Sequence, residues 1–306
     1  MKFTGERFVP TEQGEIRIEH YHRYAVVLDI VKGKAVLDVA CGEGYGSFLM
    51  ADVARTVVGV DISEDAVQHA SSIYHKPNLE FFQGSATNLA FANASFDVVV
   101  SFETIEHLLE QEEMLSEIRR VLRPDGILVI SSPNRPVYSE ESGRHNEFHL
   151  KELDFQEFDT LLHVHFSKVR YLGQRLQMSS VIQPLSGTSD VSSVWVDDGS
   201  GIRAHSGRLK DPVYFLALCG SANANIPHIG MSALYPESTD LVKHYVGFAK
   251  WAQTLDGVVV ERNEQISNLM RTVAERDGQI IESREQLGGL MRSVAEHDGQ
   301  IAEYRD

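Results

Sequence analysis

The chain has 306 residues, of which 42% are hydrophobic and 24% are charged, which is enough for one large α/β domain with an appendage. Lysine and arginine total 28 against 44 aspartates and glutamates, and the net charge of −16 argues against nucleic acid as a partner, because phosphate backbones bind cationic surfaces. Cys41 and Cys219 are the only cysteines and have no metal-binding spacing, which favours a reducing, cytoplasmic setting. Neither a signal peptide nor a run of about 18 apolar residues is present, so no membrane span is expected, and only membrane association through a partner stays open.

From residue 35 onward, short β-forming runs alternate with helical stretches. Strands are predicted at 35–40, 56–61, 79–82, 96–102 and 127–132, and helices from about Ser47, from Glu64 and up to Leu122. The sequence RPDG at 123–126 is predicted to form a turn between the last of these helices and the last strand. This alternation predicts an α/β fold, a doubly wound parallel sheet whose ligands bind at the carboxyl ends of its strands.

Beyond Pro133 the regular pattern gives way to PNRPVYSEESGRHNEFH, a loop over 133–149 that is long enough to carry a function. A helix is predicted at about 151–162, followed by a strand within 165–173 and another at 212–219. A Ser/Gly/Asp-rich insertion at 176–210 separates these two strands.

The C-terminal residues 238–306 follow a seven-residue pattern. Aliphatic side chains recur every seventh position, and leucines occupy three of the intervening positions: Val259, Ile266, Val273, Ile280, Leu287, Val294 and Ile301, with Leu255, Leu269 and Leu290. LMRTVAERDGQI, which begins at 269, returns as LMRSVAEHDGQI at 290, three heptads later. The pattern predicts a coiled coil that makes a homo-oligomer, and its β-branched residues favour a parallel dimer, with a trimer left open.

A second interpretation of this tail is an amphipathic helix folded back on the domain. Polar residues at the remaining seam positions and several glycines predict modest stability for the coil. The pattern is still running at Asp306, which leaves open a longer natural protein.

A glycine-rich turn follows the first predicted strand. VLDVACGEGYG places Asp38 near the end of that strand and Gly42, Gly44 and Gly46 in the turn, where glycine lets a ligand approach the backbone closely. Asp61 ends the second strand, a position from which a carboxylate can bind both hydroxyls of a ribose. The GxGxG spacing differs from the GxGxxG of dinucleotide-binding proteins, so an NAD-dependent dehydrogenase is only a distant alternative.

The stretch ETIEH follows the fourth predicted strand. On a helix, Glu103, Glu106 and His107 are three and four positions apart, which places them on one face. Three interpretations remain open: a divalent metal site, a metal-free general base at His107, or a surface whose glutamates complement the positive N-terminus of a helix.

Five motifs in order make residues 35–132 resemble the class I S-adenosylmethionine-dependent methyltransferases: VLDVACGEGYG, VGVDIS, GSATNLAF, FDVVVSFETIEHL and RVLRPDGILVISSPN. The resemblance implies a Rossmann-like sheet of seven strands in the order 3-2-1-4-5-7-6, the last two coming from within 163–219. It also implies an N-terminal lid at 1–30 and a methyltransferase domain at 31–235, to which the heptad pattern adds the coiled-coil tail at 238–306.

The resemblance further implies how S-adenosylmethionine is bound. Asp38 and the glycine turn would hold its methionine part, Asp61 its ribose and Ile62 its adenine. Ser85 stands where the family reads the adenine edge, although aspartate is commoner there. The residues expected at the donor are Asp38, Ala40, Gly42, Gly44, Asp61, Ile62, Ser85, Ala86, Phe102, His20 and Arg23.

The segments GERFVP and IEHYHRY and the loop at 133–149 resemble a narrower group, the methyltransferases found with bacterial polysaccharide and O-antigen biosynthesis enzymes. Some members carry long coiled coils that organise a polymerase complex or help set chain length. The resemblance covers roughly 1–175 and implies a sugar or glycan acceptor, with glycosyltransferases of the same pathway as further partners. His20, Tyr21 and Arg23 are expected to close over the donor, with an exposed capping helix as the alternative. Loop residues that could meet the acceptor are Arg135, Tyr138 and Arg144.

ETIEH also resembles the Glu-x-x-Glu-His metal motif of plant-type small-RNA 2′-O-methyltransferases and, more loosely, of ubiquinone-pathway O-methyltransferases. The small-RNA enzymes add a downstream histidine, for which His149 is the counterpart and His145 a substitute. The implied ligands are Glu103, Glu106, His107 and His149. Such a mixed oxygen and nitrogen shell suits Mn, Fe, Co or Zn better than Mg.

These observations predict a cytoplasmic O-methyltransferase that transfers a methyl group from S-adenosylmethionine to a sugar hydroxyl, with Glu103, Glu106 and His107 as catalytic residues. One alternative is a coiled-coil scaffold whose head binds the donor without turnover. A second alternative keeps the enzyme but replaces the sugar by a quinone, a lipid or a secondary metabolite.

Overall fold

The computed structural model describes residues 8–11, 14–143, 145–177, 179, 195–197, 202–204, 209–235 and 241–303. It divides the chain into two compact units, Met1–Pro236 and Glu237–Asp306. Most of the insertion predicted at 176–210 lies outside the described residues. Within it, the short strands β7 (Trp195–Asp197) and β8 (Ile202–Ala204) pair antiparallel.

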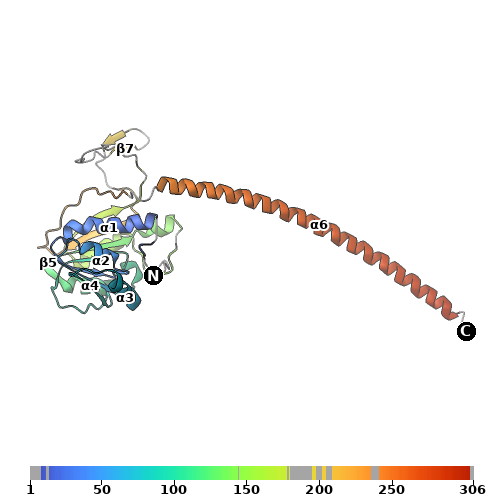
Figure 1. The fold of residues 1–306 in the computed structure, drawn as a ribbon, viewed down its shortest axis with the longest axis horizontal. Helices are drawn as coiled ribbons and strands as arrows, with labels where there is room; N and C mark the ends of the chain where they lie inside the picture. The colour runs from blue at the N-terminus through green and yellow to red at the C-terminus, as the bar shows by residue number, and fades with distance from the viewer. Residues whose placement is uncertain are drawn as a thin grey trace. The chain divides into compact units, whose positions relative to one another are not determined.

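The first unit is built on a seven-stranded sheet (Figure 1). Its strands are β1 (Ala35–Val39), β2 (Thr56–Asp61), β3 (Leu79–Gln83), β4 (Phe96–Ser101), β5 (Leu122–Pro133), β6 (Lys168–Gln174) and β9 (Tyr214–Gly220). Their order is β3-β2-β1-β4-β5-β9-β6, in which only β9 runs antiparallel to its neighbours. The predicted fold and strand order are therefore confirmed, since β9 is the seventh strand of the pattern.

Among the described residues, five α-helices accompany this sheet: α1 (Glu15–Val31), α2 (Tyr45–Met50), α3 (Glu64–Ile73), α4 (Gln111–Val121) and α5 (Phe155–His165). Pro136–Glu141 form a short π-helix in addition. Helix α2 begins earlier than the predicted Ser47, whereas α3 begins at the predicted Glu64. Helix α5 begins later than predicted because Asp154 caps it: the Asp154 carboxylate accepts from the Glu157 amide, and the Glu157 side chain accepts from the Asp154 amide.

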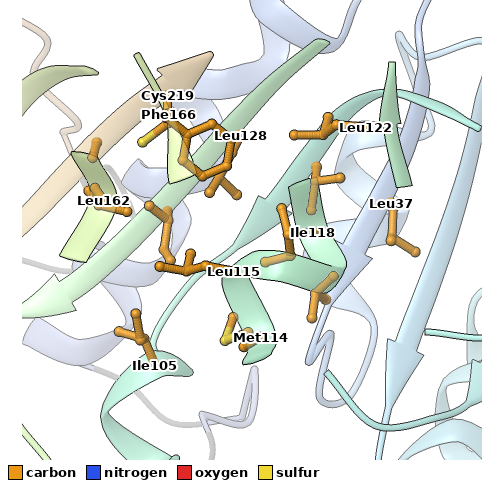
Figure 2. Close-up of a cluster of buried hydrophobic side chains, with 14 of the residues drawn as sticks. Leu37, Ile105, Met114, Leu115, Ile118, Leu122, Leu128, Leu162, Phe166 and Cys219 are labelled. Atoms are coloured by element: carbon orange, nitrogen blue, oxygen red, sulfur yellow. The ribbon is translucent and has the colours of Figure 1, made fainter. Parts of the chain in front are cut away.

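The central strands are buried on both faces, and successive residues point to opposite faces. On one face, Leu37 of β1 belongs to a buried cluster that also contains Met114 and Ile118 of α4 and Leu162 of α5 (Figure 2). On the other, Val36 belongs to a cluster with α1 and α2 residues that include Val27, Val31 and Met50. Helices thus cover both faces of the sheet, which leaves the carboxyl ends of its strands for ligands.

The RPDG segment at 123–126 is not a separate turn before the strand. Strand β5 begins at Leu122, which pairs with Phe96, and the next pair is Val98 with Ile127. The register thus shifts between these two pairs, and the four residues 123–126 lie opposite Asp97 alone as an irregular part of the strand.

The second unit contains one helix, α6 (Leu241–Glu303). The heptad residues that the structure describes along it are exposed, including Ile266, Val273, Leu287 and Val294. The helical part of the tail prediction is confirmed, while its pairing into a coiled coil stays a prediction. No helix among the described residues is long and apolar enough to cross a membrane.

Candidate functional site

The turn after β1 has an unusual backbone. Ala40, Gly42 and Gly44 all have positive φ angles, of 59°, 55° and 85°. This left-handed region is costly for alanine and accessible to glycine. A Cβ placed on Gly42 would meet no atom within 4 Å, whereas one on Gly44 would lie 2.7 Å from Ala70 and Phe81. The turn therefore packs tightly on its inner side at Gly44 and leaves open space beside Gly42, where a ligand can approach the backbone.

Asp38 lies buried beneath this turn. Its carboxylate accepts a hydrogen bond from Ser47 Oγ at 2.6 Å and weaker ones from the Tyr24 hydroxyl at 3.4 Å. Burial raises the pKa of Asp38 to about 7, an effect that the hydrogen bonds from Ser47 and Tyr24 only partly oppose. Its ionised form therefore lacks a full complement of partners, and a bound cation would supply one.

Donor affinity should depend on pH through Asp38. Since the carboxyl is about one-tenth ionised at pH 6 and nine-tenths ionised at pH 8, affinity for the ammonium-bearing methionine part should rise about tenfold over this interval. The free energy of unfolding should fall over the same interval. The pKa of Asp38 is higher in the folded than in the unfolded chain, so its contribution to stability is lost as the pH rises through about 7. Titration calorimetry on the chain and on Asp38→Asn tests this. An equal pH dependence in both proteins would refute the role of Asp38.

Asp61 holds the glycine turn and the start of α3 together. One of its carboxylate oxygens accepts from the Gly42 amide and the other from the Ser63 amide, both at 2.9 Å. The next side chain, Ile62, is 70% exposed. An exposed isoleucine directly after the buried end of a strand offers an apolar surface on which a flat ring such as adenine can pack.

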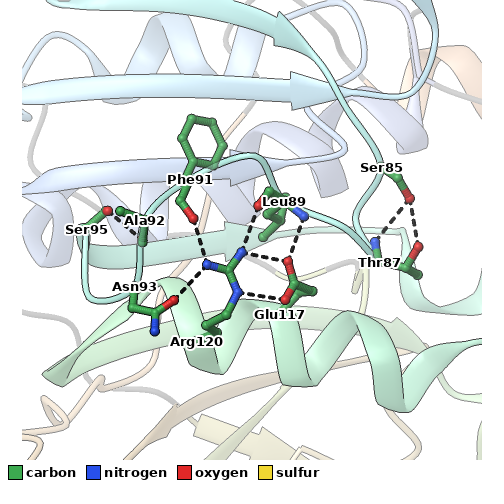
Figure 3. A network of polar contacts seen from close by, with 9 residues as sticks. All are labelled: Ser85, Thr87, Leu89, Phe91, Ala92, Asn93, Ser95, Glu117 and Arg120. Atoms are coloured by element: carbon green, nitrogen blue, oxygen red, sulfur yellow. Dashed lines mark hydrogen bonds and ion pairs between the residues drawn. The ribbon is translucent and has the colours of Figure 1, made fainter.

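The loop expected to read the adenine edge is held by α4. Arg120 donates to the carbonyls of Leu89 and Phe91 and pairs with Glu117, whose carboxylate also accepts from the Leu89 amide (Figure 3). In the same loop the Ser85 hydroxyl lies 2.8 Å from that of Thr87 and accepts from the Thr87 amide. Ala86 is partly buried. Ser85 thus shapes the local turn, and its side chain has a structural role whether or not it meets adenine.

The lid residues lie on α1. His20 Nδ1 lies 3.0 Å from the Tyr45 hydroxyl, and its ring stacks on Phe8. Burial and, secondarily, the charge of Arg23 lower the pKa of His20. Since Tyr45 opens α2 directly after the glycine turn, these contacts place His20 next to the predicted donor site.

Arg23 is 1% exposed. Its Nη1 donates to Gln174 at 2.8 Å, its guanidinium lies 4.7 Å from the centre of the Tyr214 ring, and Nη2 lies 3.9 Å from Glu103. Nε and Nη2 make no hydrogen bond to any described residue. Arg23 is thus a buried cation with unused donors. Phe102, also buried, packs edge-on against Tyr24, whose hydroxyl donates to Asp38.

ETIEH does not form the regular helix on which its spacings would place the three side chains on one face. Glu103 has a φ of 51°, Ile105–His107 form a single 3-10 turn, and α4 begins only at Gln111. A left-handed residue interrupts a right-handed helix, so the three side chains do not share one helical face. The interpretation of a solvated surface whose glutamates complement a helix N-terminus does not fit either, because α4 begins only at Gln111 and Glu106 is fully buried. A non-glycine residue held at positive φ is a mark of a strained and constrained position.

Glu103 is directed towards Arg23 and β5. Its carboxylate accepts from Ser131 Oγ at 2.7 Å, and its amide donates to the same hydroxyl at 2.9 Å. With Arg23 at 3.9 Å, the Glu103 carboxylate has its own partners. The structure does not place it with the other three predicted ligands.

Glu106, His107 and His149 do come together. Each offers an atom that could bind a metal, and these atoms lie within 4.8 Å of one another. Glu106 is fully buried, yet neither carboxylate oxygen has a hydrogen-bond partner among the described residues. Burial and, next, the charge of Glu103 raise the pKa of Glu106 well above its usual value. A buried carboxylate in this state is either protonated or paired with a cation.

The backbone brings the third member of this cluster into place. The Glu106 carbonyl accepts from the amides of Leu150 and Lys151, and the Gln111 side chain donates to the carbonyls of Ile105 and Lys151. These bonds bind the segment after His149 to ETIEH. The His107 and His149 rings consequently meet edge to face with centres 4.9 Å apart.

Hydrogen bonds at Nδ1 orient both histidine rings. His107 Nδ1 lies 2.8 Å from the Phe148 carbonyl, which as an acceptor requires the proton on Nδ1 and leaves the lone pair on Nε2. His149 Nδ1 pairs with Glu152, and its ring stacks on Tyr138. Imidazole rings that bind metals are typically held in this way by a carbonyl or a carboxylate.

The remaining loop residues are placed differently. Arg135 pairs with Glu140, Asp154 and Glu157 and so ties the loop to α5 rather than facing an acceptor. His145 is exposed and is not part of the cluster, and Arg144 lies outside the described residues. Residues that the motifs did not single out are Tyr24 and Ser47 at Asp38, Ser131 at Glu103, and Glu152 at His149. Only Glu152, three positions after His149, had a spacing that could have revealed it.

Comparisons with known proteins give a consistent result. Residues 30–169 match the family model described as a methyltransferase domain. A probable S-adenosylmethionine-dependent methyltransferase of Mycolicibacterium smegmatis is 41% identical over 167 residues, covering 53% of this chain and 63% of that protein. A fatty-acid O-methyltransferase of the same organism is 35% identical over 129 residues, covering 42% and 46%. The phthiotriol/phenolphthiotriol dimycocerosates methyltransferase of Mycobacterium leprae is 30% identical over 188 residues, covering 61% and 63%.

The chain thus spans less than two thirds of the length of these relatives. The segment matched by the family model contains the glycine turn, Asp61, ETIEH and His149. Its sheet has the strand order expected from the motifs. Residues 30–169 therefore resemble the S-adenosylmethionine-dependent methyltransferases in sequence and in strand order, which supports the kind of domain that the sequence motifs predicted.

Proposed function

We propose that the chain is an O-methyltransferase that transfers the methyl group of S-adenosylmethionine to a hydroxyl of a sugar or glycan, assisted by a divalent metal. The observation that carries the proposal is Glu106, a fully buried carboxylate without a hydrogen-bond partner among the described residues, which lies beside two oriented imidazoles. Such a set of one oxygen and two nitrogen donors suits Mn, Fe, Co or Zn. The resemblance of the N-terminal segments to polysaccharide-associated methyltransferases supports the sugar.

The reaction needs a deprotonated or polarised acceptor. A hydroxyl oxygen forms a bond to the methyl carbon while the carbon–sulfur bond of the sulfonium breaks, and the hydroxyl proton leaves. A divalent cation bound to Glu106, His107 and His149 would supply the acidity that a sugar hydroxyl lacks at neutral pH. Without a metal, His107 is the candidate that would take the proton.

The chain's own residues provide binding and orientation. In this proposal Asp38 and the turn at Gly42 hold the methionine part of the donor, and Asp61 binds the ribose hydroxyls. Arg23 offers Nε and Nη2 to a carboxylate. Glu103, which is held by Ser131 and Arg23, would position the reacting groups. Holding both substrates in one geometry accounts for much of the catalytic effect of such sites.

A lipid acceptor is the second candidate. It is favoured by the relative named a fatty-acid O-methyltransferase and by the one named for phthiotriol and phenolphthiotriol dimycocerosates. A donor-binding scaffold without turnover is the third, and any catalytic transfer eliminates it. The cluster of Glu106, His107 and His149 would activate a hydroxyl of either acceptor, whereas a fatty-acid carboxylate is already ionised at neutral pH and would need no such activation.

The test is transfer of labelled methyl from S-adenosylmethionine to separate glycan and lipid extracts, and to a panel of hexoses and deoxysugars. Each reaction is run as prepared, with chelator, and with Mn or Mg restored. Label in a glycan or sugar, lost with chelator and regained with metal, is the expected result. Label in the lipid extract alone would replace the sugar by a lipid, and indifference to chelator would make His107 a metal-free base.

A further inference from the structure

The helix α6 presents an apolar stripe that its own chain leaves exposed. In heptad terms, Val273 and Val294 occupy a positions and Leu269 and Leu290 occupy d positions, and all four side chains are between 58% and 65% exposed. A stripe of this narrow kind along a long helix is typical of a surface that packs on another helix.

Charged residues at d positions make a parallel pairing with a second copy unfavourable. In a parallel two-fold dimer, each core residue faces its own copy. Arg262 and Arg276 hold d positions and would each meet an identical arginine in the core, where like charges repel strongly. The β-branched a positions favour a parallel dimer, but they do not compensate two arginine layers. A parallel trimer gathers three arginines in each layer and is worse.

An antiparallel pairing separates these arginines. In an antiparallel dimer, a residues face d residues of the other copy, and residue i meets j wherever j meets i. In one register, Leu269 of each copy packs on Val294 of the other copy, and Leu290 of each packs on Val273 of the other. Each contact therefore occurs twice, once on either side of the two-fold axis. Arg276 then faces Leu287, and its long stem can lie along the apolar side chain while the charge reaches water. In this register the first five residues of each repeat, 269–273 and 290–294, face each other.

The flanking positions agree with this register. At e positions, Asp277 meets Arg284 of the second copy twice, and Met270 meets Met291. At g positions, Thr272 meets Ser293 and Gln279 meets Gln286, which are uncharged pairs able to hydrogen-bond. A shift by one heptad in one direction would place Asp277 opposite Asp277 of the second copy. A shift in the other direction would place Arg284 opposite Arg284, so like charges would meet in either case. Charge complementarity therefore selects one register.

We propose that α6 binds a second copy of this chain as an antiparallel two-helix coil in which Leu269 packs on Val294 and Asp277 pairs with Arg284. This pairing replaces the parallel dimer favoured by the a positions alone. It does not depend on the proposed acceptor or metal, because none of the residues involved belongs to the methyltransferase unit.

A charge-reversal cycle on the 306-residue chain tests the pairing. Asp277→Arg or Arg284→Asp alone should weaken self-association about tenfold to thirtyfold, because two ion pairs become two repulsive pairs. The double variant, Asp277→Arg with Arg284→Asp, should restore association. The two positions are seven residues apart on one helix and do not contact each other within it, so rescue requires a contact between chains. Light scattering over a dilution series gives the dissociation constants.

The matched control reverses Glu264 and Arg271, which have the same spacing at f positions facing solvent. Neither the single nor the double variant should change association. A monomeric chain, or single reversals at 277 and 284 without effect, would overturn the proposal.

Cysteine cross-linking provides an independent measurement of orientation. The native Cys41 and Cys219 are buried, so introduced thiols report alone. Leu269→Cys alone and Val294→Cys alone should each fail to cross-link, because in this register each residue lies far from the same residue of the second copy. Mixing the two variants should give a disulfide-linked dimer. A dimer linked through Leu269→Cys alone would show parallel helices and overturn the proposal.

Discussion

Replacing Glu106 with glutamine should reduce metal-dependent methyl transfer by at least about a hundredfold while leaving the protein folded. Even residues that only support metal ligands change metal affinity or activity by about tenfold to a hundredfold when they are replaced. The carboxylate is buried without hydrogen-bond partners among the described residues, so a neutral amide of the same shape removes a costly group. The free energy of unfolding of the metal-free protein should therefore stay equal or increase. Turnover with added Mn and thermal unfolding with and without Mn measure both effects.

The matched control is Glu103→Gln. Glu103 pairs with Ser131 and Arg23 and is not part of the cluster, so its replacement should leave stabilisation by Mn intact, whereas Glu106→Gln should remove it. If Glu106→Gln keeps metal-stimulated turnover, the metal site is elsewhere or absent. If Glu103→Gln alone removes metal binding, the four-ligand set predicted from the sequence is correct and the grouping of three is not.

Replacing Asp61 with alanine should weaken S-adenosylmethionine binding by about a hundredfold or more. Hydrogen bonds to a charged group contribute about 1.5–3 kcal/mol each, and Asp61 is expected to bind two ribose hydroxyls. The structure adds a second cause: the same carboxylate holds the amides of Gly42 and Ser63, so the alanine variant also loosens the glycine turn. Titration calorimetry with S-adenosylmethionine measures the loss.

Two further variants separate these causes. Asp61→Asn keeps an acceptor for one amide and should lose less affinity than Asp61→Ala. Asp65→Ala removes an exposed carboxylate from the first turn of α3, only a few residues away, and should have no effect on binding. Unchanged donor affinity in Asp61→Ala would rule out the assignment of this edge of the sheet as the donor site.

The alternation of strands and helices was predictable from the chain itself, because its signals are local, whereas the seven strands and their order followed from the family resemblance. Neighbouring strand residues such as Val36 and Leu37 point to opposite faces of the sheet, and turn residues bound the strands. Gly42 and Gly44 occupy positions where the backbone has a positive φ. Motif order then orders the strands. The length of α6 was equally predictable, since a heptad pattern is a property of neighbouring residues.

Local pattern failed where distant contacts decide the backbone. The spacing of ETIEH suits a helix, but Glu103 is held at positive φ by bonds to Ser131 on β5, and Gln111 binds the carbonyls of Ile105 and Lys151. Helical propensity is worth only tenths of a kcal/mol per residue, so a few tertiary hydrogen bonds override it.

The sequence by itself determined the kind of domain, the glycine turn with Asp38 and Asp61, and the presence of two glutamates and two histidines near one strand end. Only the tertiary structure decided which of these four act together. It brings His149 to His107 through the bonds between Glu106 and residues 150–151, leaves Glu106 buried without a hydrogen-bond partner among the described residues, and turns Glu103 towards Arg23. The physical reason is that burial and partnership depend on segments far apart along the chain, which no spacing within one segment records.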